Sequence, residues 1–196
     1  MTTKLDSTAL NQLFLTARSY NHFTDQLVSD ETIRELYDLL KWGPTSMNAQ
    51  PARYVFLRST EARERLIPAL APGNVDKTRA APVTVIVASD NAFFEHLPTQ
   101  FKAYDAKPIF AGNGVLAEIT ALRNGSLQGA YLMLAARALG LGCGAMSGFD
   151  ASKVNKEFFP DSQWKANFLV NLGYGADDGF YPRGPRLEFG QVASIL

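Results

Sequence analysis

The chain has 196 residues, of which 46% are hydrophobic and 19% are charged, values typical of one folded soluble domain that buries a core. We therefore expect a single domain over residues 1–196. Nineteen basic and nineteen acidic residues cancel, so no overall charge attracts nucleic acid or an anionic membrane surface, and neither is an expected partner.

The N-terminal part of the sequence predicts two amphipathic helices. The first residues contain no apolar segment of a secretory signal, and no later run is long enough to span a bilayer, so we expect a cytoplasmic protein. Apolar residues recur at helical spacing from Leu10 to Ala17 and again from Ile33 to Leu40. Ser29 precedes the second helix as a candidate N-cap.

The segment 43–51, Gly-Pro-Thr-Ser-Met-Asn-Ala-Gln-Pro, lies between the second helix and a strand predicted over 53–58. Its prolines restrict the backbone, and Thr, Ser, Asn and Gln provide uncharged side chains that form hydrogen bonds. A rigid, neutral, polar loop suits a ligand with carbonyl and ring-nitrogen edges. The same residue types also mark ordinary turns, so binding and a plain turn are equally open at this point.

The middle of the chain predicts a sheet flanked by helices. Strands over 53–58 and 82–88 are separated by a helix over about 60–70, which Ala71-Pro72-Gly73 would close. The following stretch, 91–112, is rich in aromatic residues without a clear period. It is either a small helical excursion whose aromatic residues form core, or a lid over a planar ligand.

The helix predicted over 126–139 is apolar nearly all round, which places it in the centre of the fold or in a subunit interface. The glycine run that follows, 140–145, matches a dinucleotide fingerprint in its GxGxxA form. A Rossmann turn follows a strand, however, whereas these glycines follow a helix, so a Rossmann dehydrogenase is disfavoured. We interpret Gly140 as the end of the helix.

The C-terminal part predicts a sheet segment over 143–146, a turn at Ser147 and Gly148, and a helix capped by Asp150. A last strand over 167–172 precedes an extended tail. Cys143 is the single cysteine, and with only two histidines the chain offers no set of metal ligands, so neither a disulfide nor a metal site is expected. Arg18, and Arg183 and Arg186 in the tail, are either surface residues or donors to a phosphate.

Taken together, the motifs resemble the FMN-dependent nitroreductase family over essentially the whole chain. They are Arg-Ser at 18–19, the segment 43–51, Gly-Leu-Gly at 140–142, Ser-Gly-Phe-Asp at 147–150 and Pro-Arg near the C-terminus. The chain is most similar to the malonic semialdehyde reductases of pyrimidine catabolism within that family. The resemblance implies an α+β fold with a mainly antiparallel sheet wrapped by helices, in an interlocked homodimer with two FMN sites at the interface.

The resemblance also assigns roles to particular residues. Residues expected to hold the FMN phosphate and ribityl chain are Arg18, Ser19, Asn21, Arg186 and, as a substitute, Arg183. Residues expected to reach the cofactor from the other subunit are Pro44, Thr45, Ser46 and Asn48. Ser147 and Gly148 would face the ring, with the Gly148 N–H directed at N5. Two departures stand out, because many relatives have an acidic residue in place of Ser147 and a lysine in place of Gly184.

The implied activity is hydride transfer from NAD(P)H to a small acceptor by a ping-pong mechanism, with FMN supplying the chemistry and no catalytic side chain. The acceptor would be malonic semialdehyde, a nitroaromatic compound or a quinone. A flavin-binding carrier or regulator without turnover is the alternative, since both need the same contacts. The residues expected to form the substrate pocket are Phe93, Phe94, Phe101, Lys102 and Phe110.

Overall fold

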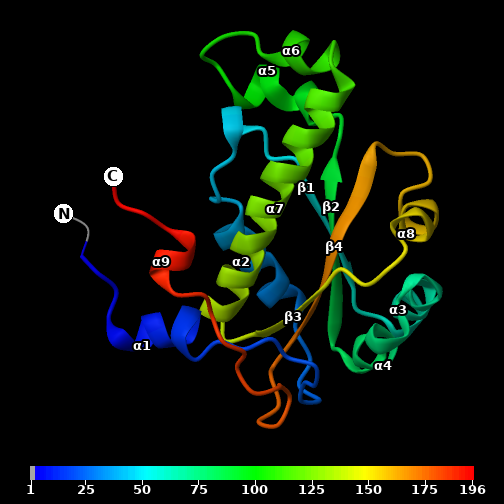
Figure 1. Cartoon of the computed structure of the whole chain (residues 1–196). Helices are drawn as coiled ribbons and strands as arrows, with labels where there is room; N and C mark the ends of the chain where they lie inside the picture. The colour runs from blue at the N-terminus through cyan, green and yellow to red at the C-terminus, as the bar shows by residue number, and fades with distance from the viewer. Residues whose placement is uncertain (1–2) are drawn as a thin grey trace.

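A computed structural model describes residues 3–196, which form one four-stranded sheet with helices on both faces (Figure 1). The strands are β1 (Ala52–Leu57), β2 (Val83–Asp90), β3 (Gly142–Met146) and β4 (Trp164–Gly173). They lie in the order β1-β2-β4-β3, and every neighbouring pair is antiparallel. This arrangement confirms the predicted α+β fold with a mainly antiparallel sheet.

The helices differ greatly in length, and the long α7 crosses one face of the sheet (Figure 1). In chain order they are α1 (Ser7–Leu10), α2 (Asp30–Leu40), α3 (Thr60–Leu66), α4 (Pro72–Ala80), α5 (Leu97–Gln100), α6 (Lys107–Ala111), α7 (Gly114–Ala138), α8 (Ala151–Phe158) and α9 (Phe189–Val192). Shorter turns are η1 (Asn11–Leu15), η2 (Ser46–Asn48), η3 (Ile67–Ala69) and η4 (Phe93–His96). None of the helices in the described chain is long and apolar enough to cross a membrane.

The buried strand β2 separates two hydrophobic clusters because its side chains alternate between the faces of the sheet. Val83, Val85 and Val87 pack with α2 and α7 on one face. Ile86 and Ala88 pack with residues of α3 and α8 on the other face. Every residue of β2 is buried, which explains why apolar residues occupy both faces of the strand and its sequence does not alternate.

Local signals in the sequence place several element ends correctly. The Ser29 hydroxyl accepts the N–H of Thr32 at 3.1 Å and caps α2. Gly140 has a φ of +77° and ends α7, where the N–H of Leu141 donates to the Ala136 carbonyl at 2.8 Å. The Asp150 carboxylate accepts the N–H of Lys153 and caps α8. These predictions are confirmed.

Other boundaries were wrong. Ala71-Pro72-Gly73 does not close a helix but begins α4, because proline is favoured in the first turn of a helix. The helix predicted from residue 126 begins at Gly114, where Asn113 is the N-cap; polar residues such as Arg123 hid its first half. The first helical segment, α1 with η1, ends at Leu15, so Ala17 lies outside it.

The stretch 91–112 folds into η4, α5 and α6, and two of its aromatic residues are core. Phe93 is 0% and Phe110 is 4% exposed, and their rings meet edge to face at 5.0 Å. They pack with Ala117 and Ala121 of α7. This corrects their expected place in a pocket wall, because a side chain that fills the core is not available to a substrate. Phe94 and Phe101 are half-buried, and Lys102 is exposed.

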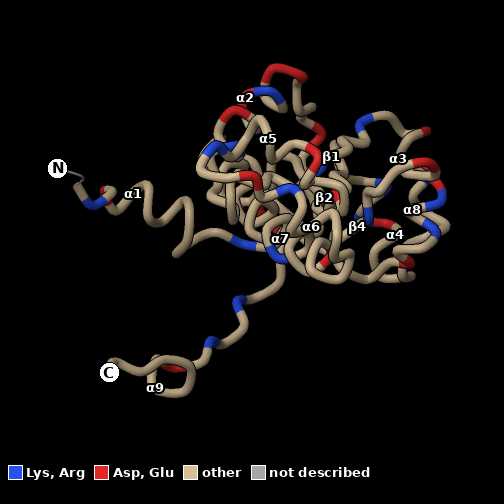
Figure 2. The backbone as a smooth tube through the Cα atoms, turned by 90° about the horizontal axis from the view of Figure 1, so that it is seen from above, with Lys and Arg blue, Asp and Glu red and all other residues tan. Residues whose placement is uncertain are grey.

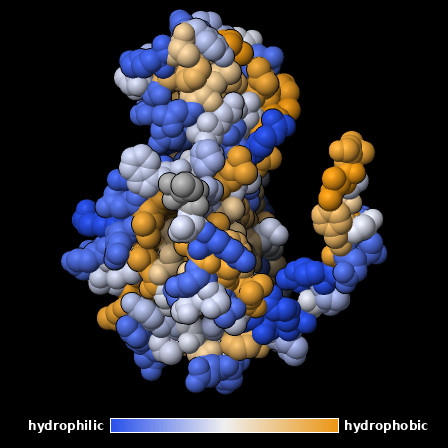
Figure 3. Space-filling model, turned by 90° about the vertical axis from the view of Figure 1, so that its left-hand side faces the viewer, coloured by the Kyte–Doolittle hydropathy of each residue, from blue (hydrophilic) through white to orange (hydrophobic). Residues whose placement is uncertain are grey.

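Apolar side chains remain exposed along α7 and at both ends of the chain. The outer stripe of α7 consists of five exposed residues with exposed fractions of 37–51%, namely Leu116, Ile119, Leu122, Leu127 and Tyr131. The segment α1 and the tail with α9 stand away from the body (Figure 2). The tip of the tail is hydrophobic (Figure 3), and Ile195 is 89% exposed. These surfaces are suited to burial against another chain.

Candidate functional site

The strand β3 forms the floor of the candidate site, and the segment 18–21 runs beside it. The Tyr20 N–H donates to the Cys143 carbonyl at 2.9 Å, and Ser19 forms a parallel bridge with Cys143. A Cβ on Gly144 would lie 2.3 Å from the Tyr20 carbonyl oxygen, so only glycine allows this close approach. Gly142 and Gly144, two glycines of the run that resembles a dinucleotide motif, therefore serve the packing of the N-terminal segment on the sheet.

Two arginines gather where the segment 18–21 crosses the tail. The Arg18 guanidinium donates to the Tyr181 carbonyl and lies 4.5 Å from the centre of the Phe180 ring. Arg183 donates to the carbonyls of Leu15 and Ala17, both at 2.8 Å. Within residues 3–196 neither guanidinium forms an ion pair with a carboxylate, so both keep their positive charge for an external anion.

Arg186 is placed differently from the other two arginines. It donates to the neighbouring carbonyls of Gly184 and Pro185 and is exposed in the tail. The structure thus brings Arg18, Ser19 and Arg183 together and leaves Arg186 apart. A cavity of about 340 Å³ lies beside Arg18, lined also by Tyr20, Arg137, Gly142, Cys143 and Gly175.

The turn at Ser147 and Gly148 lies at the other end of β3, and its carbonyl groups are held by the protein. The Gly148 carbonyl accepts the Ala71 N–H at 2.9 Å and the Asn74 side-chain amide at 2.8 Å. The Ser147 carbonyl accepts the Phe149 N–H at 3.0 Å. Ser147 and Gly148 are exposed. The Gly148 N–H group is without an acceptor among the described residues.

The sequence analysis missed Asn74, which binds the Gly148 carbonyl, and did not consider Lys77, which follows it on the same helix. Both lie on α4, and their spacing of three residues puts them on the same face of that helix. Burial lowers the pKa of the half-buried Lys77 ammonium. Their spacing of three residues indicates a shared face only on a helix, and the sequence analysis did not predict α4.

The five residues of β3 separate the arginines from the Ser147–Gly148 turn. At a rise of about 3.3 Å per residue they span roughly 15 Å. An elongated ligand with an anionic group at one end and a hydrogen-bonding ring at the other suits this arrangement. Ala145 is the exposed residue of the strand and leaves space along it.

The loop 43–51 lies elsewhere in the chain. In Figure 1 it appears in cyan beside the upper half of α7, whereas β3 lies toward the lower end of that helix. The Asn48 side chain donates to the Gln100 carbonyl at 3.1 Å, and Thr45 accepts the Gln50 N–H at 3.1 Å. Pro44, Ser46 and Asn48 are exposed. One chain therefore holds two separate parts of the predicted site.

A cavity of about 830 Å³ lies between α2 and the free edge strand β1, among residues that include Tyr37, Tyr54, Arg53 and Trp164. It is larger than the cavity beside Arg18, but none of the predicted cofactor-binding residues lines it. The Tyr54 hydroxyl is buried there without a hydrogen-bond partner, and burial raises its pKa. We assign the candidate site to β3 because the unpaired arginines and the exposed turn lie there.

We expect Cys143 to be chemically inert. Its side chain is buried, and burial raises the pKa of the thiol to about 12. Thiolate is the reactive form, so at pH 8 almost none is present. The folded protein should not react with a disulfide reagent such as dithionitrobenzoate within minutes, whereas the unfolded chain should release one equivalent of chromophore. Rapid reaction of the folded protein would contradict the buried placement.

Comparisons with known proteins agree with the fold. The sequence profile described as "Nitroreductase family" matches residues 15–174. A protein of Burkholderia lata named "Putative NADH dehydrogenase/NAD(P)H nitroreductase" is 58% identical over 195 residues, which cover both chains fully.

Two solved structures share the fold at low sequence identity. A "nitroreductase family protein" from Streptococcus pneumoniae has a TM-score of 0.79 at 21% identity, and the match covers 97% of this chain and 100% of the other. A "putative nitroreductase in complex with FMN" from Exiguobacterium sibiricum has a TM-score of 0.82 at 20% identity and full coverage of both chains.

Proposed function

The chain belongs to the nitroreductase family, and we propose that it is an FMN-dependent oxidoreductase that oxidises NAD(P)H and reduces a small acceptor by a ping-pong mechanism. The observation that carries the proposal is the arrangement along β3, with unpaired arginines at one end and an exposed, fixed turn at the other. The Burkholderia relative named for NAD(P)H and the neighbour with FMN support it.

At the phosphate end, we assign Arg18, Ser19 and Arg183 to the FMN phosphate. Guanidinium groups form strong charge-assisted hydrogen bonds with phosphate oxygens, and the Ser19 hydroxyl adds a donor. We assign Arg183 rather than Arg186 to the phosphate because Arg183 is held beside the segment that carries Arg18. The Asn21 N–H is used by the Gly179 carbonyl at 2.6 Å, which leaves its side-chain amide for the ribityl chain.

At the ring end, the Gly148 N–H and the Lys77 ammonium supply positive charge. FMN held here would supply the hydride transfer from NAD(P)H to the acceptor. Fixed positive groups beside the ring favour its reduced, anionic form without needing to reorganise. Ser147 carries no charge, so at this position no carboxylate offsets the positive groups that we propose. No nucleophilic side chain is required.

We propose a homodimer with an FMN site at each end of the interface, because the loop 43–51 lies apart from β3 within one chain. Pro44, Thr45, Ser46 and Asn48 of one subunit would reach the cofactor of the other, and the tail would cross to the partner. The outer stripe of α7 supplies an apolar surface for such an interface. Each site is incomplete without the second chain.

The acceptor that we propose is malonic semialdehyde, which is reduced to 3-hydroxypropanoate, or a nitroaromatic compound or quinone. A small carboxylate needs a cation near the ring, whereas a nitroaromatic compound needs mainly apolar surface. The excursion 91–112 offers both, since Lys102 is exposed and Phe101 is half-buried. The Lys102 ammonium donates only to the Pro98 carbonyl, at 2.7 Å, and has no acidic partner in the described chain.

Lys102→Ala is expected to lower the rate at which malonic semialdehyde oxidises the reduced enzyme by about tenfold, because one charge-assisted contact is lost. Oxidation by a nitroaromatic compound should change little, and reduction by NAD(P)H should remain near wild type. Phe101→Ala should instead slow the nitroaromatic reaction. The two half-reactions are followed separately by anaerobic stopped flow, with Lys156→Ala on α8 as the control. Unchanged relative rates in both variants would remove residues 101–102 from the acceptor site.

A further inference from the structure

Two side-chain amides are buried in the middle of α7. Asn124 is 3% and Gln128 is 4% exposed, and their spacing of four residues puts them on the same face of the helix. Burying an amide costs free energy unless its polar atoms find partners. The partners of these two amides therefore indicate why polar residues occupy core positions.

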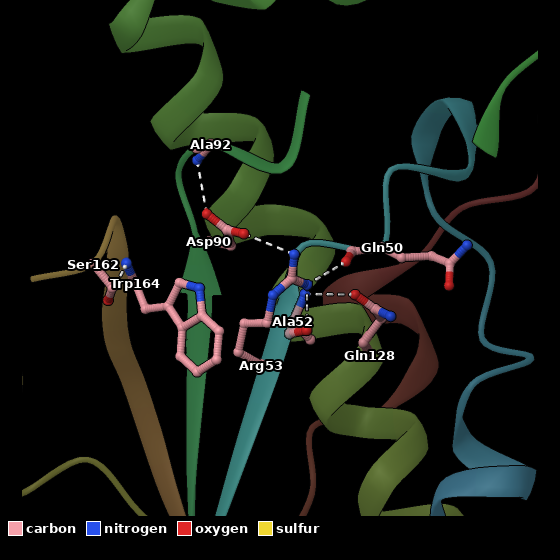
Figure 4. A network of polar contacts seen from close by, with 8 residues as sticks. All are labelled: Gln50, Ala52, Arg53, Asp90, Ala92, Gln128, Ser162 and Trp164. Carbon is pink, nitrogen blue, oxygen red and sulfur yellow. Dashed lines mark hydrogen bonds and ion pairs between the residues drawn. The ribbon is translucent and has the colours of Figure 1, made fainter. Parts of the chain in front are cut away.

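Both amides accept hydrogen bonds from the backbone of the loop that follows α2. The Asn124 Oδ1 accepts the Ser46 N–H at 2.8 Å, while its Nδ2 donates to the Thr120 carbonyl at 2.9 Å and so fixes the orientation of the amide. The Gln128 Oε1 accepts the Ala52 N–H at 2.9 Å (Figure 4). The two bonds bracket the segment 46–52.

The segment between these bonds has an unfavourable backbone conformation. Met47, Asn48 and Gln50 have φ values of 53°, 49° and 43°, in the left-handed region that residues other than glycine rarely adopt. Such a conformation persists only where the surrounding structure determines it strongly. Within this segment Ser46 and Asn48 are exposed at the surface.

An ion pair holds the other side of the same segment. Arg53 donates to the carbonyls of Gln50 and Ala52, both at 2.9 Å, and pairs with the Asp90 carboxylate at 2.7 Å (Figure 4). Asp90 in turn accepts the Ala92 N–H at 2.9 Å. The segment is thus fixed from β1 on one side and from α7 on the other.

We propose that Asn124 and Gln128 are positioning residues that hold the segment 46–52 in the conformation in which it contacts FMN bound to the partner subunit. This inference rests on the proposed function, because that function supplies FMN as the ligand that the exposed residues Ser46 and Asn48 would contact. Neither amide touches the cofactor. Each acts through the backbone N–H that it binds, so that loss of the acceptor lowers the population of the binding-competent loop.

Gln128→Met tests the inference, since methionine has a similar length but leaves the Ala52 N–H without its acceptor. We expect the Kd for FMN to rise about tenfold, because the apparent Kd scales with the inverse of the competent population. Gln128→Glu keeps an acceptor oxygen and should restore most of the affinity. Asn124→Leu and Asn124→Asp form a second pair with the same expected contrast.

The matched control is Asn167→Leu, which removes a half-buried amide that donates to Ser126 of α7 at 2.9 Å without contacting the loop. Circular dichroism establishes that each variant is folded. Hydrogen exchange of the FMN-free protein should be faster over residues 46–52 in Gln128→Met and Asn124→Leu alone. Wild-type exchange and wild-type Kd in these folded variants would overturn the proposal, as would equal losses in Gln128→Met and Gln128→Glu.

Mixed dimers show whether the loop acts on the partner's site. Co-expression of Gln128→Met chains with Arg18→Ala chains, carrying different tags, gives a dimer in which one site combines both defects and the other has neither. We expect this dimer to bind one FMN with wild-type affinity. Two weak sites would overturn action across the interface. If the wild-type protein binds no FMN, the proposed function fails, while hydrogen exchange still reports whether the amides order the loop.

Discussion

Arg18→Ala is expected to raise the Kd for FMN roughly ten- to hundredfold while the chain stays folded. The variant loses a charge-assisted contact with phosphate, which contributes on the order of 1.5–3 kcal/mol. Within residues 3–196, the Arg18 guanidinium donates to the Tyr181 carbonyl, lies over the Phe180 ring and pairs with no carboxylate, so its removal leaves no carboxylate unpaired. Quenching of flavin fluorescence on titration with FMN-free protein gives the Kd.

The control for this measurement is Arg65→Ala, which breaks an exposed ion pair with Glu157 between α3 and α8 and should leave the Kd unchanged. Arg183→Ala should weaken binding more than Arg186→Ala does, because only Arg183 is held beside the segment that carries Arg18. Unchanged FMN affinity in folded Arg18→Ala would reassign this residue to the surface.

Leu127→Asp is expected to convert the proposed dimer into a monomer that has lost most of its FMN. Leu127 is 49% exposed in the outer stripe of α7, so the substitution costs a single folded chain little. In an interface it buries an unpaired charge, which is strongly unfavourable. Loss of the partner also removes the loop 43–51 from the site. Sedimentation velocity with detection at a flavin wavelength measures both effects.

Lys156→Glu on α8 serves as the control for a new negative charge on an exposed helix outside the stripe. It should sediment as the wild type does and keep its flavin. A Leu127→Asp protein that remains dimeric would place the interface on another surface. A wild-type monomer that retains FMN would contradict the shared site altogether.

Local rules account for the parts of the fold that the sequence predicted. Ser29 and Asp150 cap helices through bonds to residues three positions away, and Gly140 ends α7 through its own φ, so a short window contains the necessary information. The strands β1, β2 and β4 were also predictable, because a short window of each sequence is rich in apolar residues. The start of α7 lacks such a signal, because polar side chains interrupt the pattern there.

The parts of the site that escaped prediction depend on contacts between distant segments. Asn124 and Gln128 look like surface residues in the sequence, and only their bonds to Ser46 and Ala52, more than 70 positions away, show why they are buried. Arg183 and Arg186 have nearly the same local sequence, and the structure separates them through Leu15 and Ala17. The placement of Arg18 and Ser147 at the two ends of one site likewise depends on β3, which pairs with the segment that carries Arg18.

The visible absorption spectrum of the purified protein, followed anaerobically during addition of NADH or NADPH and then of an acceptor, tests the central claim most directly. We predict the bands of oxidised flavin at about one FMN per chain, their bleaching by the reduced nicotinamide, and their return with malonic semialdehyde or a nitroaromatic compound. A colourless protein that takes up no added FMN would contradict the flavin site. A yellow protein that neither nicotinamide bleaches would instead indicate a flavin carrier without turnover.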